Sequence, residues 1–239
     1  MTMNPSDYTN TIAGSSLSPA AQRAEFIKNT YLYLSGAILA FAVLSAVFFT
    51  SGLGMTMLNA LGGSRYGWLA VMGAFMLVGW VATSLADNAE SNQKQLMGLG
   101  IYVLAESLIF APLFALADRV APGAISASVF VTAALVAGLT FVAFTSKKDF
   151  SFLGGILKIA GFIALGAIIA SVIFGFQLGI WFSAIMILFA GAAVLYDTSI
   201  IIRHYPMDRP AGAALHLFAS IALMLWYVLR FIMSFMSDD

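Results

Sequence analysis

The chain has 239 residues, of which 61% are hydrophobic and 9% charged, and its 11 basic residues balance its 11 acidic ones. A soluble domain typically has about 25% charged residues. These charges are too few to cover a water-exposed surface, so the sequence predicts one domain embedded in lipid. The neutral balance, without a basic patch, excludes a nucleic-acid partner, and the absence of cysteine excludes disulfides and thiolate metal sites.

The chain begins with a polar segment, residues 1–29, which is rich in Ser, Asn and Thr. A secretory signal peptide would start its apolar core much nearer the N-terminus, so we interpret this segment as a polar arm and not as a signal. The expected domain division is therefore a cytoplasmic N-terminal arm, 1–29, followed by a transmembrane domain, 30–239.

Seven apolar runs follow, each about 20 residues long, which is the length that an α-helix needs to cross a hydrocarbon core of about 30 Å. Glycine-rich or polar segments separate them. The segment between the first two spans, marked by glycines at both of its ends, is expected to be a loop. The sequence thus predicts an all-α polytopic bundle of about seven transmembrane helices, at residues 30–49, 66–85, 96–117, 124–144, 153–174, 180–202 and 213–236.

Lys and Arg residues are distributed unevenly between the two ends of these predicted helices. Cytoplasmic loops of membrane proteins carry an excess of both residues. This rule predicts a cytoplasmic N-terminus and, after seven spans, a C-terminus on the outside. The outer end would hold Arg65 and Arg119, with Arg230 near it, and the cytoplasmic end would hold the larger set of Arg23, Lys28, Lys94, Lys147, Lys148, Arg203 and Arg209.

Charged side chains inside the spans are candidates for function, because a charge at the bilayer centre costs at least about 2.5–3.5 kcal/mol on insertion scales. Asp197 lies roughly 9 Å from the cytoplasmic end of the sixth span, at about 1.5 Å per residue. It is either a cation or proton site, or an inward-facing carboxylate that pairs with a neighbouring helix for packing. Glu106 lies near the middle of the third span, where a carboxyl group has to be neutral or paired.

Three further polar residues of the spans suit ordinary roles at a membrane interface. Lys158 lies one turn inside the fifth span, where lysine reaches the headgroups by snorkelling. Arg230, about two turns from the end of its helix, suits either snorkelling or an ion pair. His216 begins the seventh span and is either an interfacial polar residue or a pH sensor. The sequence shows no zinc-ligand spacing, nucleophile elbow or phosphate loop, so we do not expect an enzyme.

Three segments of the chain resemble the bacterial branch of the Bax inhibitor-1 family. They are the sequence Leu195-Tyr196-Asp197-Thr198, the loop 148–155 and the last span from Ala214 to Arg230. The resemblance covers nearly the whole chain and implies seven helices, with a central last helix enclosed by the other six. For some members it also implies a pH-sensitive calcium leak, in which two aspartates of the last two helices share a proton and latch the pore.

One position departs from this family pattern. Asp197 matches the first aspartate of the latch, but the alignment of the last span places Ser220 at the second, and Leu223 where an asparagine is usual. Serine cannot ionise, so a latch of two carboxylates cannot form, and the Ser220 hydroxyl is a hydrogen-bond partner for Asp197 instead. A pH response would then come from Asp197 alone, or together with Glu106 or His216. A calcium site would lose one anionic ligand.

Two functions follow from this resemblance. The first is a leak for calcium or another cation in a bacterial inner membrane, with Asp197 as the gating group and candidate calcium ligand, and Glu106 as a second pore carboxylate. The second is a non-transporting protein that binds membrane proteins or a membrane protease and modulates quality control or the stress response. The missing second aspartate favours the second function. In both, the lipid bilayer is the surrounding partner, and calcium is a possible ion for the first.

Overall fold

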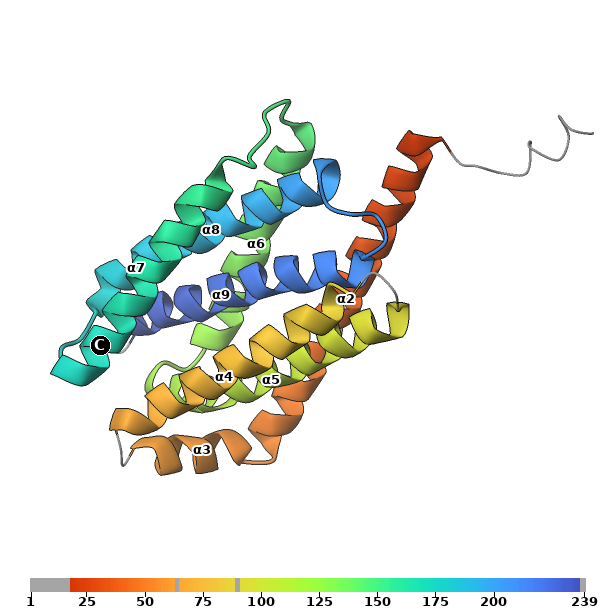
Figure 1. Ribbon diagram of the computed structural model, residues 1–239. Helices are drawn as coiled ribbons and strands as arrows, with labels where there is room; N and C mark the ends of the chain where they lie inside the picture. Colours follow the sequence, from red (N-terminus) through yellow and green to blue (C-terminus); the bar gives the residue numbers. More distant parts are fainter. Residues whose placement is uncertain (1–17, 63–64, 89–90, 237–239) are drawn as a thin grey trace, which may run out of the picture.

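The computed structural model describes residues 18–62, 65–88 and 91–236, and all regular structure within these ranges is helical. Seven of the described helices are long and apolar enough to cross a membrane, which confirms the predicted all-α bundle (Figure 1). In chain order the helices are α2 (Pro19–Thr50), α3 (Leu53–Gly62), α4 (Arg65–Ala86), α5 (Asn92–Val120), α6 (Ala124–Thr145), α7 (Leu153–Phe174), α8 (Gly179–Arg203) and α9 (Pro210–Met236).

The first spanning helix begins well before the apolar run that predicts it. Ser18 caps α2, because its side chain accepts a hydrogen bond of 3.3 Å from the backbone N–H of Ala21, and Pro19 occupies the first turn, where its missing N–H is tolerated. With 32 residues the helix is about 48 Å long, which exceeds the bilayer core. Residues 19–29 of the predicted arm therefore belong to α2, whereas residues 1–17 lie outside the described ranges.

The segment between the first two spans contains the short helix α3, so the expectation of a loop was wrong there. Gly52, at a φ of 74°, ends α2 in a left-handed conformation that favours glycine. The ten residues of α3 are too few to cross a bilayer, and they pack against α2, α4 and α5 at one end of the bundle. Glycine marks only the ends of this segment, while the apolar residues between them form a helix that can pack.

The last helix lies in the middle of the bundle (Figure 1). α9 packs against α2, α4, α5, α6 and α8, and buried residues occur along it from Ala211 to Leu229. α7 packs against α8 and α4 instead, and none of its residues, all of which are described, is fully buried. The central position of the last helix is thus confirmed, although in the described part of the chain five helices surround it and not six.

Successive spanning helices run in opposite directions, so the bundle has two distinct ends. We call them the α3 end, with the turns 121–123 and 175–178, and the Arg203 end, with the segments 146–152 and 204–209.

Contacts between distant parts of the sequence hold the Arg203 end together. Arg23 of α2 donates a hydrogen bond of 2.6 Å to the backbone carbonyl of Tyr205. The buried Gln95 amide of α5 donates one of 2.9 Å to the carbonyl of Asp208. The segment between α8 and α9 is therefore fixed from two sides, and it sets the position in which α9 enters the bundle.

A glycine on α5 allows that helix to approach α4 closely. A Cβ atom at Gly98 would lie against the backbone of Ala82 and Ala86, whereas one at Gly100, on another face of the same helix, would meet nothing within 4 Å. Lipid provides no hydrophobic drive between helices, so their association depends on close packing, which small residues at such contacts allow.

These two glycines make a matched pair for a stability test. We expect Gly98→Ala to lower the free energy of unfolding by about 1–3 kcal/mol, since the added methyl group overpacks a contact between two backbones. Gly100→Ala, by contrast, should be neutral or stabilise the helix by up to about 1 kcal/mol. Thermal unfolding of the detergent-solubilised variants measures both effects, and equal melting temperatures would contradict the close approach of α4 and α5.

Candidate functional site between two cavities

Asp197 and Ser220 meet where α8 lies along α9. The Ser220 hydroxyl donates a hydrogen bond of 2.5 Å from its Oγ to Asp197 Oδ2. α8 and α9 form the most extensive helix pair in the described chain, so this contact lies within a long packed interface. A neutral hydroxyl, and not a second charge, therefore satisfies one oxygen of the carboxylate.

Two cavities lie on opposite sides of this contact. The larger, of about 1220 Å³, extends toward the α3 end and includes Ala193 of α8 and Ser220 of α9 in its wall. The smaller, of about 210 Å³, lies toward the Arg203 end and includes Asp197 of α8 and His216 of α9. On both helices the wall residues of the two cavities are one turn apart, or about 6 Å. The hydrogen bond between Asp197 and Ser220 thus separates the two cavities.

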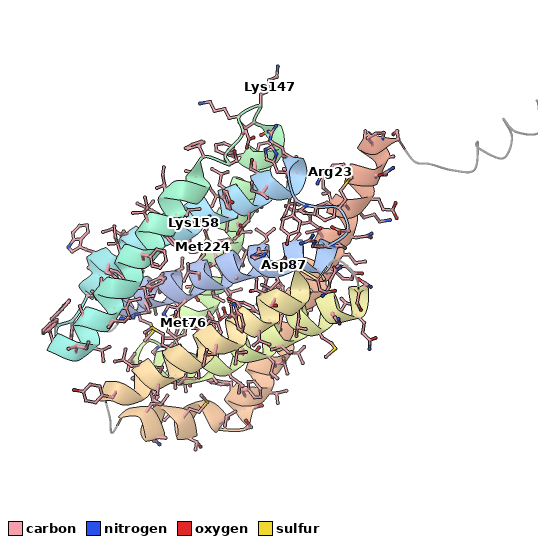
Figure 2. The ribbon with its side chains drawn as sticks, in the orientation of Figure 1. Arg23, Met76, Asp87, Lys147, Lys158 and Met224 are labelled. Carbon is pink, nitrogen blue, oxygen red and sulfur yellow. The ribbon has the colours of Figure 1, made fainter. Side chains whose placement is uncertain are left out.

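A second polar cluster joins three elements beside the smaller cavity. Tyr205, from the segment before α9, donates a hydrogen bond of 2.6 Å to Asp87 Oδ1, and His216 Nε2 lies 3.2 Å from Asp87 Oδ2. Figure 2 shows Asp87 where the end of α4 approaches the beginning of α9. Both Tyr205 and His216 also line the smaller cavity, so the cluster adjoins the space next to Asp197.

The charge of Asp87 is stabilised by its neighbours. Burial acts to raise the pKa of its carboxyl group, but hydrogen bonds from His216 and Tyr205, together with the positive charges of His216 and Arg209, lower the pKa below its ordinary value. Asp87 is therefore an anion at neutral pH.

Neither Asp87 nor Tyr205 was among the candidate residues predicted from the sequence. The hydrogen-bond partners of Asp87 lie 118 and 129 residues away in the sequence. The only local signal was that Asp87 is the first charged residue after an apolar span, and many loop residues share that position.

Glu106 belongs to the larger cavity and is separate from the Asp197 contact. Its side chain is buried, with 7% of the residue exposed, and it lines the cavity together with Tyr102, one turn earlier on α5. The Tyr102 hydroxyl faces the carboxyl group. Within residues 18–62, 65–88 and 91–236, no Lys, Arg or His forms an ion pair with Glu106.

The two intramembrane cations predicted from the sequence do not reach Asp197. Arg230 is exposed and lines the larger cavity toward the α3 end. Lys158 is exposed on α7. Leu223, at the position where the family usually has asparagine, also lines the larger cavity. Of the candidates from the sequence, the structure thus groups Asp197 with Ser220 and His216, and Glu106 with Arg230.

The loop between α6 and α7 is attached to the end of α8. His204 Nε2 lies 2.6 Å from Asp149 Oδ2, and Arg203 donates hydrogen bonds to the backbone carbonyls of Ser146 and Lys148, at 2.9 and 3.1 Å. Figure 2 shows Lys147, at the tip of this loop, pointing away from the helices. These contacts hold the Arg203 end of α8. Arg203 and His204 lie six and seven residues after Asp197.

A resident metal ion does not fit the donors around Asp197. Among the described residues there is no group of three or more His, Asp or Glu side chains that could hold a metal ion. The contact offers one carboxylate and one hydroxyl, whereas calcium takes 6–8 oxygen ligands. The donors at this contact are therefore too few to hold a calcium ion.

The fold and this contact define a polytopic helical membrane protein that holds a carboxylate between its last two helices. The model of the family described as inhibitor of apoptosis-promoting Bax1, the Bax inhibitor-1 family, matches residues 23–237. The chain belongs to this family. An uncharacterized protein of Pseudomonas aeruginosa, PA2604, is 40% identical over 107 residues, which make up 41% of this chain and 45% of that protein. The matched region thus covers less than half of that relative.

The contact between Asp149 and His204 predicts a pH-dependent stability. Hydrogen bonds from His204 and from the backbone N–H of Ser151 lower the pKa of Asp149 from 3.8 to about 2. The carboxylate therefore stabilises the fold above pH 3.8, and this contribution is lost as the pH falls through about 2.

We expect Asp149→Asn to lower the Tm at pH 7 by a small amount, on the order of 1–2 °C, because the pair is largely exposed. The difference from the unmodified protein should shrink as the pH is lowered from about 4 to about 2. Thermal unfolding in detergent over this range measures it, and Asp208→Asn is the control. A difference in Tm that did not change with pH would contradict this assignment.

Proposed function

We propose that this protein is a regulated leak for calcium or a similar cation, in which the hydrogen bond between Ser220 and Asp197 is the closed gate. The observation that supports this proposal is the pair of cavities, which approach each other from opposite ends of the bundle and are separated at this contact. The family membership is consistent with the proposal.

The single carboxylate has two roles in this mechanism. When the gate is closed, the Ser220 hydroxyl donates to Asp197, and α8 and α9 stay together. A cation that enters from either cavity competes with the hydroxyl for the same carboxylate oxygens, since it offers a stronger electrostatic partner in a medium of low dielectric. Movement of α8 away from α9 then joins the two cavities. Glu106, in the wall of the larger cavity, is a second contact for the cation along this path.

The pH response of this gate differs from that of two carboxylates. A serine hydroxyl can donate to a carboxylate and accept from a carboxylic acid, so the contact persists in both protonation states of Asp197. What changes with pH is the charge next to the gate. His216 lines the same cavity as Asp197, and it contacts Asp87, on which Tyr205 and Arg209 also act. A protonated His216 repels calcium from the cavity, so the leak is weaker at pH 6 than at pH 8.

We further propose that the Arg203 end faces the cytoplasm of a bacterium and that the protein lies in its inner membrane. The described residues of this end include Arg23, Lys28, Lys94, Lys147 and Arg203, and most of the chain's basic residues lie here. This distribution agrees with the excess of Lys and Arg in cytoplasmic loops. With seven spans the C-terminus is then outside.

Two substitutions at the gate should change calcium flux in opposite directions. Ser220→Ala removes the closing hydrogen bond and keeps the anion. We expect it to raise the flux about tenfold or more, since a hydrogen bond to a charged group is worth about 1.5–3 kcal/mol. Asp197→Asn keeps a polar partner for Ser220 but removes the charge that attracts the cation, and we expect it to lower the flux to near that of empty liposomes.

Calcium uptake into liposomes that hold the purified protein, at pH 6 and pH 8, measures both effects. Asp118→Asn, an exposed aspartate at the α3 end of α5, is the matched control. An unchanged flux and pH dependence in Asp197→Asn would rule out this gate.

The histidine beside the gate should carry much of the pH dependence. The side chain of His216→Gln can still donate a hydrogen bond to Asp87, but it cannot become a cation between pH 6 and pH 8. We expect its flux at pH 6 to rise toward the value at pH 8, while the flux at pH 8 stays within about twofold of the unmodified protein. The same liposome assay measures this, with His204→Gln at the other histidine as control. An unaltered ratio between the two pH values would exclude His216 as the sensor.

The absence of a second carboxylate at Ser220 supports one other function, that of a protein which binds membrane proteins or a membrane protease and does not transport. Folded protein that gives no flux at either pH would favour it. Co-purification of a membrane protease that is lost on removal of residues 1–17 would then be the observation in its support.

A further inference from the structure

The larger cavity has the composition of a site for a bulky apolar ligand. Its volume of about 1220 Å³ exceeds the roughly 300–1,000 Å³ of most small-molecule sites. Residues of α4, α5, α7, α8 and α9 line it, and most of the lining is apolar. Eight aromatic residues contribute to the wall, among them Trp68, Phe75, Tyr102 and Trp226.

One buried carboxyl group lies in this largely apolar wall. Glu106 is 7% exposed, and in the described part of the chain it has no basic partner, only the facing hydroxyl of Tyr102. A buried carboxylate without a counter-charge is costly. A positively charged ligand that lies in the cavity beside Glu106 would offset this cost.

The basic side chain that lines the same cavity, Arg230, lies at a different depth from Glu106. Arg230 is exposed and lies six residues before the end of α9, about 9 Å along the helix. Glu106 lies 14 residues before the end of α5, about 21 Å along its axis. Arg230 is therefore an exposed group close to the α3 end, where we place the opening of the cavity, and Glu106 lies deeper.

The surroundings of Glu106 favour an organic cation over a metal ion. Calcium requires 6–8 oxygen ligands, and Glu106 belongs to no cluster of acidic or histidine side chains among the described residues. Aromatic rings, in contrast, attract weakly hydrated cations through their faces, and most strongly when water is excluded. An organic cation with an apolar body fits both the aromatic wall of the cavity and the carboxyl group of Glu106.

We propose that the larger cavity binds an amphipathic organic cation, whose charged group pairs with Glu106 and whose apolar body lies against the aromatic wall. The site centres on Glu106 of α5, whereas the gate carboxylate Asp197 lines the other cavity and only the Ser220 side of the gate borders this one. Binding requires no ion conduction, so this inference goes beyond the proposed leak and does not depend on it.

Tetraphenylphosphonium is a suitable probe, since it is a bulky apolar cation, and tetraphenylborate is an anion of similar size and shape. Equilibrium dialysis against the purified full-length protein in detergent measures the binding of both. We expect saturable binding of tetraphenylphosphonium that exceeds binding of tetraphenylborate by about tenfold or more. Glu106→Gln should weaken binding of the cation by about tenfold or more, and Glu25→Gln, on the exposed start of α2, should leave it unchanged.

Three further variants test where the cation binds and which charges it meets there. Val172→Trp fills the cavity from α7, which has no fully buried residue. It should weaken binding without removing the Glu106 carboxyl group. This variant tests the site even if Glu106→Gln does not fold. Arg230→Gln removes the cation near the opening and should strengthen binding. Asp197→Asn should bind like the unmodified protein even where it stops calcium flux.

Equal binding of the two probes, or equal affinities of the unmodified protein and the Val172→Trp variant, would overturn the proposal. So would an unchanged affinity in folded Glu106→Gln. Loss of calcium flux in Asp197→Asn with intact probe binding would support both functions, whereas absence of flux with intact probe binding would refute only the leak.

Discussion

The structure depends on how a carboxylate is accommodated inside a helix bundle that is surrounded by lipid. Asp197 cannot be solvated by the bilayer, so its partners have to come from the neighbouring helix. The Ser220 hydroxyl supplies one of them at 2.5 Å. Because this contact lies between the two cavities, the hydrogen bond that satisfies the carboxylate also separates them. That coincidence is why a structural hydrogen bond here is also a candidate gate.

Contacts at the Arg203 end fix the position of α9 next to this candidate gate. Asp87 at the end of α4 contacts both Tyr205 and His216, and Arg23 of α2 holds the carbonyl of Tyr205. The beginning of α9 is therefore attached to two other helices, one turn before Ser220. In the proposed leak, a change in the charge of His216 would act on the gate in two ways, through the field in the smaller cavity and through the attachment of α9 to Asp87.

The two buried acids of the chain have different surroundings and hence different chemistry. Asp197 has a hydroxyl partner, a small cavity and a nearby histidine, which suits a passing metal cation whose entry depends on pH. Glu106 has aromatic neighbours and a large cavity, which suits a bulky organic cation. α7 has a part in this difference, because it packs against α8 and α4 and not against α9, and so it leaves room beside the half of α9 nearer the α3 end.

The sequence by itself determined the class of the protein, the seven spans, the central last helix through the family resemblance, and the pairing of Asp197 with Ser220. These follow from composition, run length and alignment, which are local or depend on relatives. It did not predict α3, because glycines at both ends of a short apolar segment are typical of a loop as well as of a short helix. Only the tertiary structure decided that Asp87 and Tyr205 join His216, that Glu106 and Asp197 line different cavities, and that one hydrogen bond separates those cavities. The physical reason is that each of these relations joins side chains from helices distant in the sequence, and the packing of α9 among its neighbours places them.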